Sequence, residues 1–100
     1  MTTTQSMQLW SAYVLHIVDG KKQDVIAAAT GVNQGTISRW VNAKTVPNKA
    51  AEVASLARAF GRNPLEAFVA AGMLEESEAG RGLSDESRRL LSGLKAHVTA

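Results

Sequence analysis

Apolar residues recur every three or four positions along most of the chain, and polar residues fill the positions between them. This spacing puts the apolar side chains on one face of an α-helix. Glycine, proline and capping residues divide the pattern into five helices and a further helical stretch near the carboxyl end. The sequence therefore predicts an all-α protein.

The first predicted helix covers residues 7–19 and is closed by Gly20. Its apolar stripe consists of Trp10, Tyr13, Val14 and Ile17. Aromatic side chains at helical spacing usually fill a core. We therefore interpret Trp10 and Tyr13 as core residues rather than as stacking partners for bases.

Residues 23–43 describe two short helices joined by a tight turn. One face of the first helix holds Ile26, Ala27 and Thr30, and one face of the second holds Ile37, Trp40 and Val41. In the turn, Gly31 lacks the restriction that a Cβ imposes, Val32 supplies an apolar plug, and Asn33 is a good N-cap. The two apolar faces pack on each other, which leaves one polar face of the second helix free.

That free face carries side chains suited to the edges of base pairs. We expect Gln34 to contact an adenine, Arg39 to contact a guanine or else a phosphate, and Ser38 to lie beside them. Thr36 is expected to touch a thymine methyl group or a phosphate. Two interpretations of Gly35 stay open: it brings the backbone close to DNA or leaves room for a thymine methyl group, or it has no role at a solvent-facing site.

Two more helices follow. Asn48 is predicted to cap a helix at residues 49–60, and residues 63–66 combine a cap, a proline and a glutamate in the order typical of a helix start. The core positions of these two helices are Val53, Leu56, Ala57, Phe60, Leu65, Phe68, Val69 and Met73. Residues 75–82 are charged, small and glycine-containing, which predicts a linker or a loose turn.

The last predicted helix begins at Ser84, followed by Asp85 and Glu86. Its narrow apolar stripe consists of Leu90, Leu91, Leu94 and Val98. An isolated helix of this length with Gly93 inside it would be marginal, so the stripe must dock. It either covers the core of its own chain or pairs with a second copy, and we favour the first because it needs no partner.

In this register the chain resembles the helix-turn-helix of the Cro and lambda-repressor type, the XRE family. The shared features are Gln23, Ala27, Gly31, Ile37, Trp40, Asn42, Lys44 and Pro47. The resemblance extends over residues 10–74. It implies a five-helix lambda-repressor-like DNA-binding domain at 1–74. Beyond the resemblance, the residue pattern predicts a linker at 75–82 and an additional C-terminal helix at 83–100.

The resemblance also implies which side chains face the DNA backbone. Phosphate contacts are expected from Lys22, Gln23, Asn33, Asn42 and Lys44. Gln23 should in addition brace Gln34, the first residue of the recognition helix at 34–42. Ala43 departs from the family, which usually has a left-handed glycine there, so we expect Asn42 to adopt that conformation or the helix to continue.

Composition reduces the number of protein classes to which the chain could belong. A chain of 100 residues with 45% hydrophobic content fits one small domain, and the absence of cysteine excludes disulfides and thiolate chemistry. No run approaches the ~18 apolar residues of a membrane span, and no secretory signal is visible, so a cytoplasmic protein is expected. Residues 1–72 hold seven basic and four acidic side chains, against four and five in residues 73–100, so the DNA-reading part is weakly basic.

These observations favour a sequence-specific regulator that binds double-stranded DNA and acts as a small repressor, without a metal or cofactor. One such reader covers few base pairs, so we expect a homodimer on an inverted-repeat operator. The alternative is a protein-binding module, an antitoxin or adaptor whose C-terminal helix engages a partner. An enzyme is disfavoured because the chain has no cysteine, paired-carboxylate motif or phosphate loop.

Overall fold

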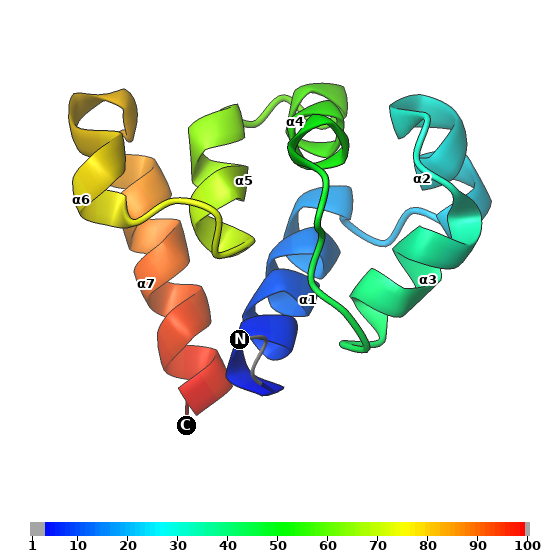
Figure 1. Ribbon diagram of the computed structural model, residues 1–100, viewed down its shortest axis with the longest axis horizontal. Coiled ribbons are helices and arrows are strands. Elements are labelled where there is room, and N and C mark those ends of the chain that lie inside the picture. The colour runs from blue at the N-terminus through cyan, green and yellow to red at the C-terminus, as the bar shows by residue number, and fades with distance from the viewer. Residues whose placement is uncertain (1–3, 100) are drawn as a thin grey trace.

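The computed structural model describes residues 4–99, and within that range the chain is helical with no β-strand. Its elements are α1 (Thr4–Val18), α2 (Gln23–Thr30), α3 (Gln34–Val41), α4 (Ala50–Ala59), α5 (Pro64–Ala70), α6 (Glu76–Ala79), a 3-10 turn η1 (Gly80–Gly82) and α7 (Asp85–Thr99) (Figure 1). The predicted all-α class is confirmed. Residues 1–3 and Ala100, which belong to the predicted leader and last helix, lie outside the described residues.

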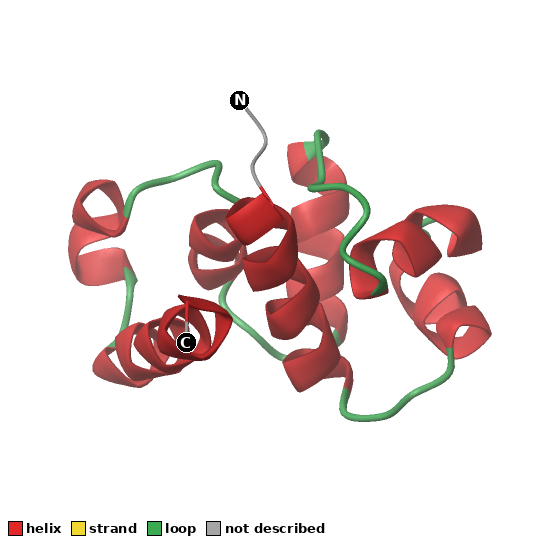
Figure 2. Cartoon of the chain, turned by 90° about the horizontal axis from the view of Figure 1, so that it is seen from below, coloured by secondary structure: helices red, strands yellow, loops and turns green. Residues whose placement is uncertain are grey.

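Helix α1 lies in the middle of the molecule. It packs against α3, α5 and α7, and it separates the α2–α3 pair on one side from α7 on the other (Figure 1). The view from below shows the same order (Figure 2). Helix α4 packs against α2 and α5 and so closes the core across α1. The C-terminal helix and the helix-turn-helix segment therefore occupy opposite sides of α1.

The aromatic residues of α1 form the centre of the core, as the apolar stripe predicted. Trp10, Tyr13 and Val14 are fully buried. The Trp10 ring stacks on Tyr13 with centroids 5.6 Å apart and meets the edge of Trp40 at 5.3 Å. The helix begins at Thr4, earlier than the predicted start at Met7. These burials confirm that the aromatic side chains are not available for stacking on bases.

The predicted cap of the fourth helix is wrong. Helix α4 begins at Ala50, and its N-cap residue is Lys49, whose side chain makes no capping hydrogen bond. Pro47 is buried, and Lys49 is extended with φ −122° and ψ 114°. Asn48 and Lys49 thus connect the buried proline to the start of the helix. Asn48 therefore lies one position before the N-cap.

The fifth helix starts as predicted but ends early. Asn63 accepts a hydrogen bond from the Leu65 amide at 2.9 Å, which is the N-cap that the sequence indicated. The helix ends at Ala70, because Gly72 turns the chain with φ +80°. Met73 was predicted to lie in the core of this helix, but it follows that turn and its side chain is exposed.

Residues 75–82 contain helix α6 and the 3-10 turn η1, in contrast to the predicted linker or loose turn. Glu75 and Glu78 form a reciprocal capping box around α6. The Asn63 side-chain amide donates to the Gly82 carbonyl oxygen at 2.7 Å. An added Cβ on Gly82 would lie 2.5 Å from Leu65 Cδ1, so the backbone passes directly over α5 at this point. Charge and small residues here serve helix capping and close packing rather than flexibility.

Helix α7 docks on its own chain, which is the favoured of the two predicted alternatives. Ser84 accepts a hydrogen bond from the Ser87 amide at 3.1 Å and so caps the helix. Leu91 is fully buried, and Leu90 and Leu94 pack against the core. Among residues 4–99, no helix is long and apolar enough to cross a membrane.

Candidate nucleic-acid interface

The α2–α3 pair is held to the core by its inner side chains. Ile26, Val32, Ile37 and Trp40 are all buried. Gly31 adopts φ +76° and donates its N–H to the Ala27 carbonyl at 2.9 Å, so it ends α2 as predicted. Thr30 fastens the turn, because its hydroxyl donates to the Ile26 carbonyl at 2.8 Å and accepts from the Val32 amide at 3.1 Å.

Helix α3 begins at the predicted cap. The Asn33 side-chain oxygen accepts a hydrogen bond from the Gly35 amide at 2.8 Å. Asn33 itself is exposed. Its carboxamide oxygen is therefore used within the protein, and its carboxamide NH₂ group is the donor available to a phosphate.

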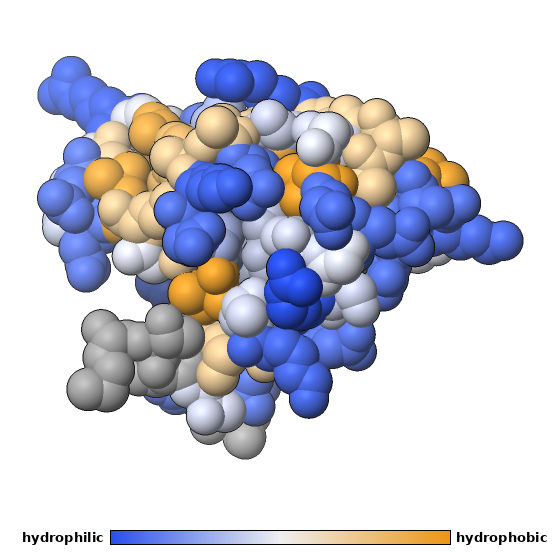
Figure 3. Space-filling view, turned by 45° about the vertical axis from the view of Figure 1, so that its right-hand side comes forward, coloured by the Kyte–Doolittle hydropathy of each residue, from blue (hydrophilic) through white to orange (hydrophobic). Residues whose placement is uncertain are grey.

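The outward side of α3 carries the five predicted base-contacting residues. This reading row consists of Gln34, Gly35, Thr36, Ser38 and Arg39. Gln34, Gly35 and Arg39 are exposed, and Thr36 and Ser38 are half-buried. Helix α7 lies on the opposite side of α1 and does not cover the row (Figure 1). With the α2–α3 side turned forward, the surface is largely hydrophilic or neutral, with separate hydrophobic spots (Figure 3).

Arg39 does not extend freely into solvent. Its Nη2 donates to Thr36 Oγ1 at 3.1 Å, which folds the guanidinium back along α3. An added Cβ on Gly35 would lie 3.6 Å from Arg39 Nη1 and 3.0 Å from Asn33 Oδ1. The missing side chain at position 35 thus leaves space for the capping oxygen of Asn33, whereas a Cβ there would only touch the arginine head at ordinary contact distance.

The carboxyl end of α3 is fastened by Asn42. Its side-chain amide donates to the Ser38 carbonyl at 2.8 Å and lies 3.5 Å from the Ser38 hydroxyl oxygen. Asn42 is exposed. Its Nδ2 is thus partly engaged within the helix, and the predicted phosphate contact would compete with this hydrogen bond.

Both expectations for the end of α3 are wrong. Helix α3 ends at Val41, and Asn42 has φ −95°. Ala43 itself takes the left-handed conformation, with φ +55°. Its N–H donates to the Trp40 carbonyl at 3.1 Å and the Lys44 N–H donates to the Arg39 carbonyl at 2.8 Å. These two hydrogen bonds form a Schellman motif, which offsets the cost of placing alanine there.

The amino end of α2 presents the other predicted phosphate contacts. Lys22 is exposed and occupies the N-cap position without a side-chain capping hydrogen bond. Gln23 is half-buried. Within the described residues no hydrogen bond joins Gln23 to Gln34, so the predicted brace is not present in this structure. In the first turn of α2 the Val25 N–H already donates to Asp24 Oδ1 at 2.9 Å, so the protein's own carboxylate uses part of the anion-binding capacity of this helix end.

A hollow of about 300 Å³ separates α3 from the loop that follows it. Its wall includes Arg39 and Thr36 from α3, Lys49 after the loop and Glu52 from α4. Lys49 was not among the predicted contacts, because its distance from Arg39 depends on the path of the loop. Lys49 follows Lys44 and Pro47 closely in the sequence. This spacing is the signal that would have indicated another basic side chain near the reading row.

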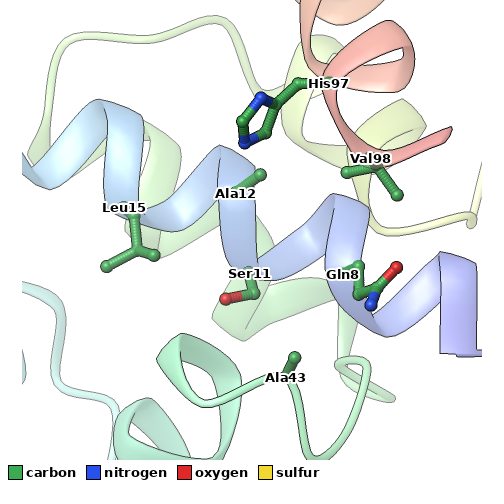
Figure 4. A pocket seen from close by; sticks show the side chains of 7 residues that line it. All are labelled: Gln8, Ser11, Ala12, Leu15, Ala43, His97 and Val98. Carbon is green, nitrogen blue, oxygen red and sulfur yellow. The ribbon is translucent and has the colours of Figure 1, made fainter. Parts of the chain in front are cut away.

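A second hollow, of about 290 Å³, lies between α1, the turn after α3 and α7 (Figure 4). It is lined by Gln8, Ser11, Ala12, Leu15, Ala43, His97 and Val98. Among the described residues that line it, His97 has the one titratable side chain. Within residues 4–99, no group of three or more His, Cys, Asp or Glu side chains is arranged to hold a metal ion.

Comparison with known proteins assigns the chain to no family. No family model, no curated protein and no solved structure matches it.

Proposed function

We propose that this protein is a sequence-specific, double-stranded DNA-binding transcriptional regulator, a small repressor that reads the major groove with α3. The observation that carries the proposal is the exposure of the reading row on a helix whose other face is buried. Amide, hydroxyl and guanidinium groups in one row match the donors and acceptors of base edges in the major groove. None of the five residues is fully buried.

Exposed basic side chains before and after α3 in the sequence would supply the contacts to phosphate. Lys22 precedes α3 in the sequence and Lys44 follows it, and both side chains are exposed. Lys49 is a third exposed basic side chain. Phosphate contacts position a reader without specifying sequence. Lys22, Gln23, Asn33, Asn42 and Lys44 would in this way fix the register of α3, while the reading row selects the bases.

A homodimer on an inverted repeat would give the specificity that one short helix lacks. The protein-binding alternative needs a free apolar face on the C-terminal helix. Leu91 is buried in the chain's own core, and Leu90 and Leu94 pack against it. This docking favours DNA over an antitoxin or adaptor that presents α7 to a partner.

Selection of bound sequences from a random pool of duplex DNA tests the proposal. We expect an enriched motif with two-fold symmetry, bound more tightly than a scrambled duplex at the same salt concentration. Gln34→Ala and Arg39→Ala should each weaken binding to the enriched motif by about 1–3 kcal/mol, because a bidentate base contact is lost.

Arg89→Ala is the matched control for the arginine variant. Arg89 is exposed on α7, on the opposite side of α1 from α3 (Figure 1), so its removal should change binding little. An enriched pool without a motif would refute sequence-specific reading. Equal losses on the enriched and scrambled duplexes would move Gln34 and Arg39 from base contacts to phosphate contacts.

A further inference from the structure

Glu66 is a fully buried carboxylate shared by three parts of the chain. Its Oε1 accepts hydrogen bonds from the Tyr13 hydroxyl and Arg62 Nε, both at 2.8 Å. Its Oε2 accepts from Arg62 Nη2 at 2.6 Å and from the Ser87 hydroxyl at 2.5 Å. One side chain of α5 therefore ties α1 to α7 through charge-assisted hydrogen bonds, which are stronger than neutral ones.

Tyr13 connects this carboxylate to α3 through aromatic contacts. Its ring stacks on Trp10, and Trp10 meets the edge of Trp40 on α3 at 5.3 Å between centroids. All three rings are buried. An unbroken series of contacts thus runs from Ser87 on α7 through Glu66 and α1 to the inner face of α3.

A second contact joins α1 to the end of α3. The Ser11 hydroxyl donates to the Val41 carbonyl at 2.8 Å, and it supplies a partner for one of the carbonyls that every helix end leaves open. Figure 4 shows Ser11 on the side of α1 that faces the turn at Ala43, while His97 and Val98 of α7 lie along the other side. A shift of α1 would therefore change its contacts with α3 and with α7.

We propose that the docking of α7 controls how firmly α3 is held, with the hydrogen bond from Ser87 to Glu66 as the latch and α1 as the element that transmits its state. Release of the latch leaves Glu66 with one donor fewer and separates it from α7, so the carboxylate holds Tyr13 and α1 less firmly. Helix α3 then loses part of the support that Trp10 and Ser11 give it. This coupling is a property of the folded chain alone, so it can be measured without DNA.

Native-state hydrogen exchange of the Ser87→Ala protein, without denaturant, tests the coupling. We expect the amides of α1, α3 and α7 to exchange about fivefold faster or more, the effect of losing one hydrogen bond of ordinary strength. The amides of α4 should keep their rates, because α4 contributes none of the linked side chains Ser87, Glu66, Tyr13, Trp10 and Trp40. Tyr13→Phe cuts the next link and should speed exchange in α3 to a similar extent.

Ser92→Ala is the matched control, since Ser92 is an exposed serine on the same helix. Its exchange rates should equal those of the unaltered protein. Faster exchange confined to α7 in the Ser87→Ala protein would overturn the proposal, because the latch would then act on its own helix only. A uniform increase that includes α4 would overturn it too, since that pattern reports a loss of global stability.

Discussion

At the scale of single residues, Gly35 is a position where helix stability and the proposed DNA binding can be tested separately. In Gly35→Ala, alanine favours the helix by about 1 kcal/mol, but its Cβ would lie 3.0 Å from the capping oxygen of Asn33 and 3.6 Å from the Arg39 head. Because Asn33 and Arg39 are both exposed and can move slightly, we expect an unchanged or higher melting temperature together with severalfold weaker binding to the enriched motif. Thermal unfolding and a binding titration check the two parts.

Unchanged affinity in that variant would decide between the two interpretations of Gly35. It would mean that glycine at this solvent-facing position has no role in binding. Weaker affinity with full stability would instead place the missing side chain among the determinants of the reading row.

Lys44 allows a separate test of phosphate contact. Lys44→Ala should lower affinity on enriched and scrambled duplexes alike, and it should reduce the slope of log affinity against log salt by about 0.9, the value for one phosphate. Titrations at several salt concentrations provide the slope. A slope equal to that of the unaltered protein would remove Lys44 from the interface.

Exposure of the reading row could be predicted because it follows from helical spacing alone. The bend of Arg39 toward Thr36 could not, because side-chain rotamers are not encoded in a hydrophobic pattern. The sequence pattern places Glu66 in a helix start, and that position explains a glutamate without any distant partner. Its actual partners Tyr13 and Ser87 lie 53 and 21 positions away in the chain, and only the fold brings them together.

At the scale of elements, the left-handed conformation of Ala43 strains the end of α3, and a substitution by glycine would remove this strain. The turns at Gly61 and Gly72 use the same Schellman hydrogen bonds as the turn at Ala43, and those two positions hold glycine with φ +71° and +80°. Ala43→Gly should therefore raise the free energy of unfolding by about 1 kcal/mol. For a domain of this size, a shift in melting temperature of about 4–8 °C would report it.

Gly61→Ala is the opposite change in the same motif. It should lower the melting temperature by a similar amount, because nothing but backbone conformation opposes a Cβ at that position. No gain from Ala43→Gly would mean that the turn after α3 stores no strain.

The sequence of segment 75–82 predicts a linker or loose turn, whereas the structure has α6 and η1 there, and the difference has a physical reason. Glycine, serine and charged residues are typical of flexible connections, yet the same residues also cap short helices and permit close approach. The capping box of α6 and the passage of Gly82 over Leu65 use them in the second way. The choice between the two depends on whether a neighbouring surface is present, which a local pattern does not contain.

At the scale of the whole molecule, the Glu66 cluster predicts a pH dependence of stability. Burial alone would raise the pKa of Glu66, but hydrogen bonds from Arg62, Ser87 and Tyr13 outweigh it and hold the pKa below the ordinary value of 4.5. Hydrogen bonding to Glu66 raises the pKa of Arg62, and burial with the Glu66 hydrogen bond raises that of Tyr13. All three groups therefore keep their neutral-pH charge in the folded state.

Because the folded pKa of Glu66 is lowered, its contribution to stability is fully present above pH 4.5 and is lost as pH falls toward the lowered pKa. Glu66→Gln should remove that part of the acid sensitivity. It should also cost about 2–3 kcal/mol at neutral pH, since Arg62 loses its buried partner and keeps only partial exposure to solvent and the exposed carboxylate of Glu86 at 3.6 Å. Denaturant unfolding at pH 3 to 7 measures both effects, and equal acid loss in the two proteins would contradict this role of Glu66.

The contact between Trp10 and Trp40 determines what a spectroscopic experiment on this protein observes. These are the two tryptophans of the chain, and their rings meet at 5.3 Å where α1 supports α3. Indole fluorescence therefore reports the integrity of that junction, whereas far-ultraviolet circular dichroism averages over every helix. If the emission signal melts before the helical signal, α3 detaches while the rest of the fold persists, and the protein does not unfold in one step.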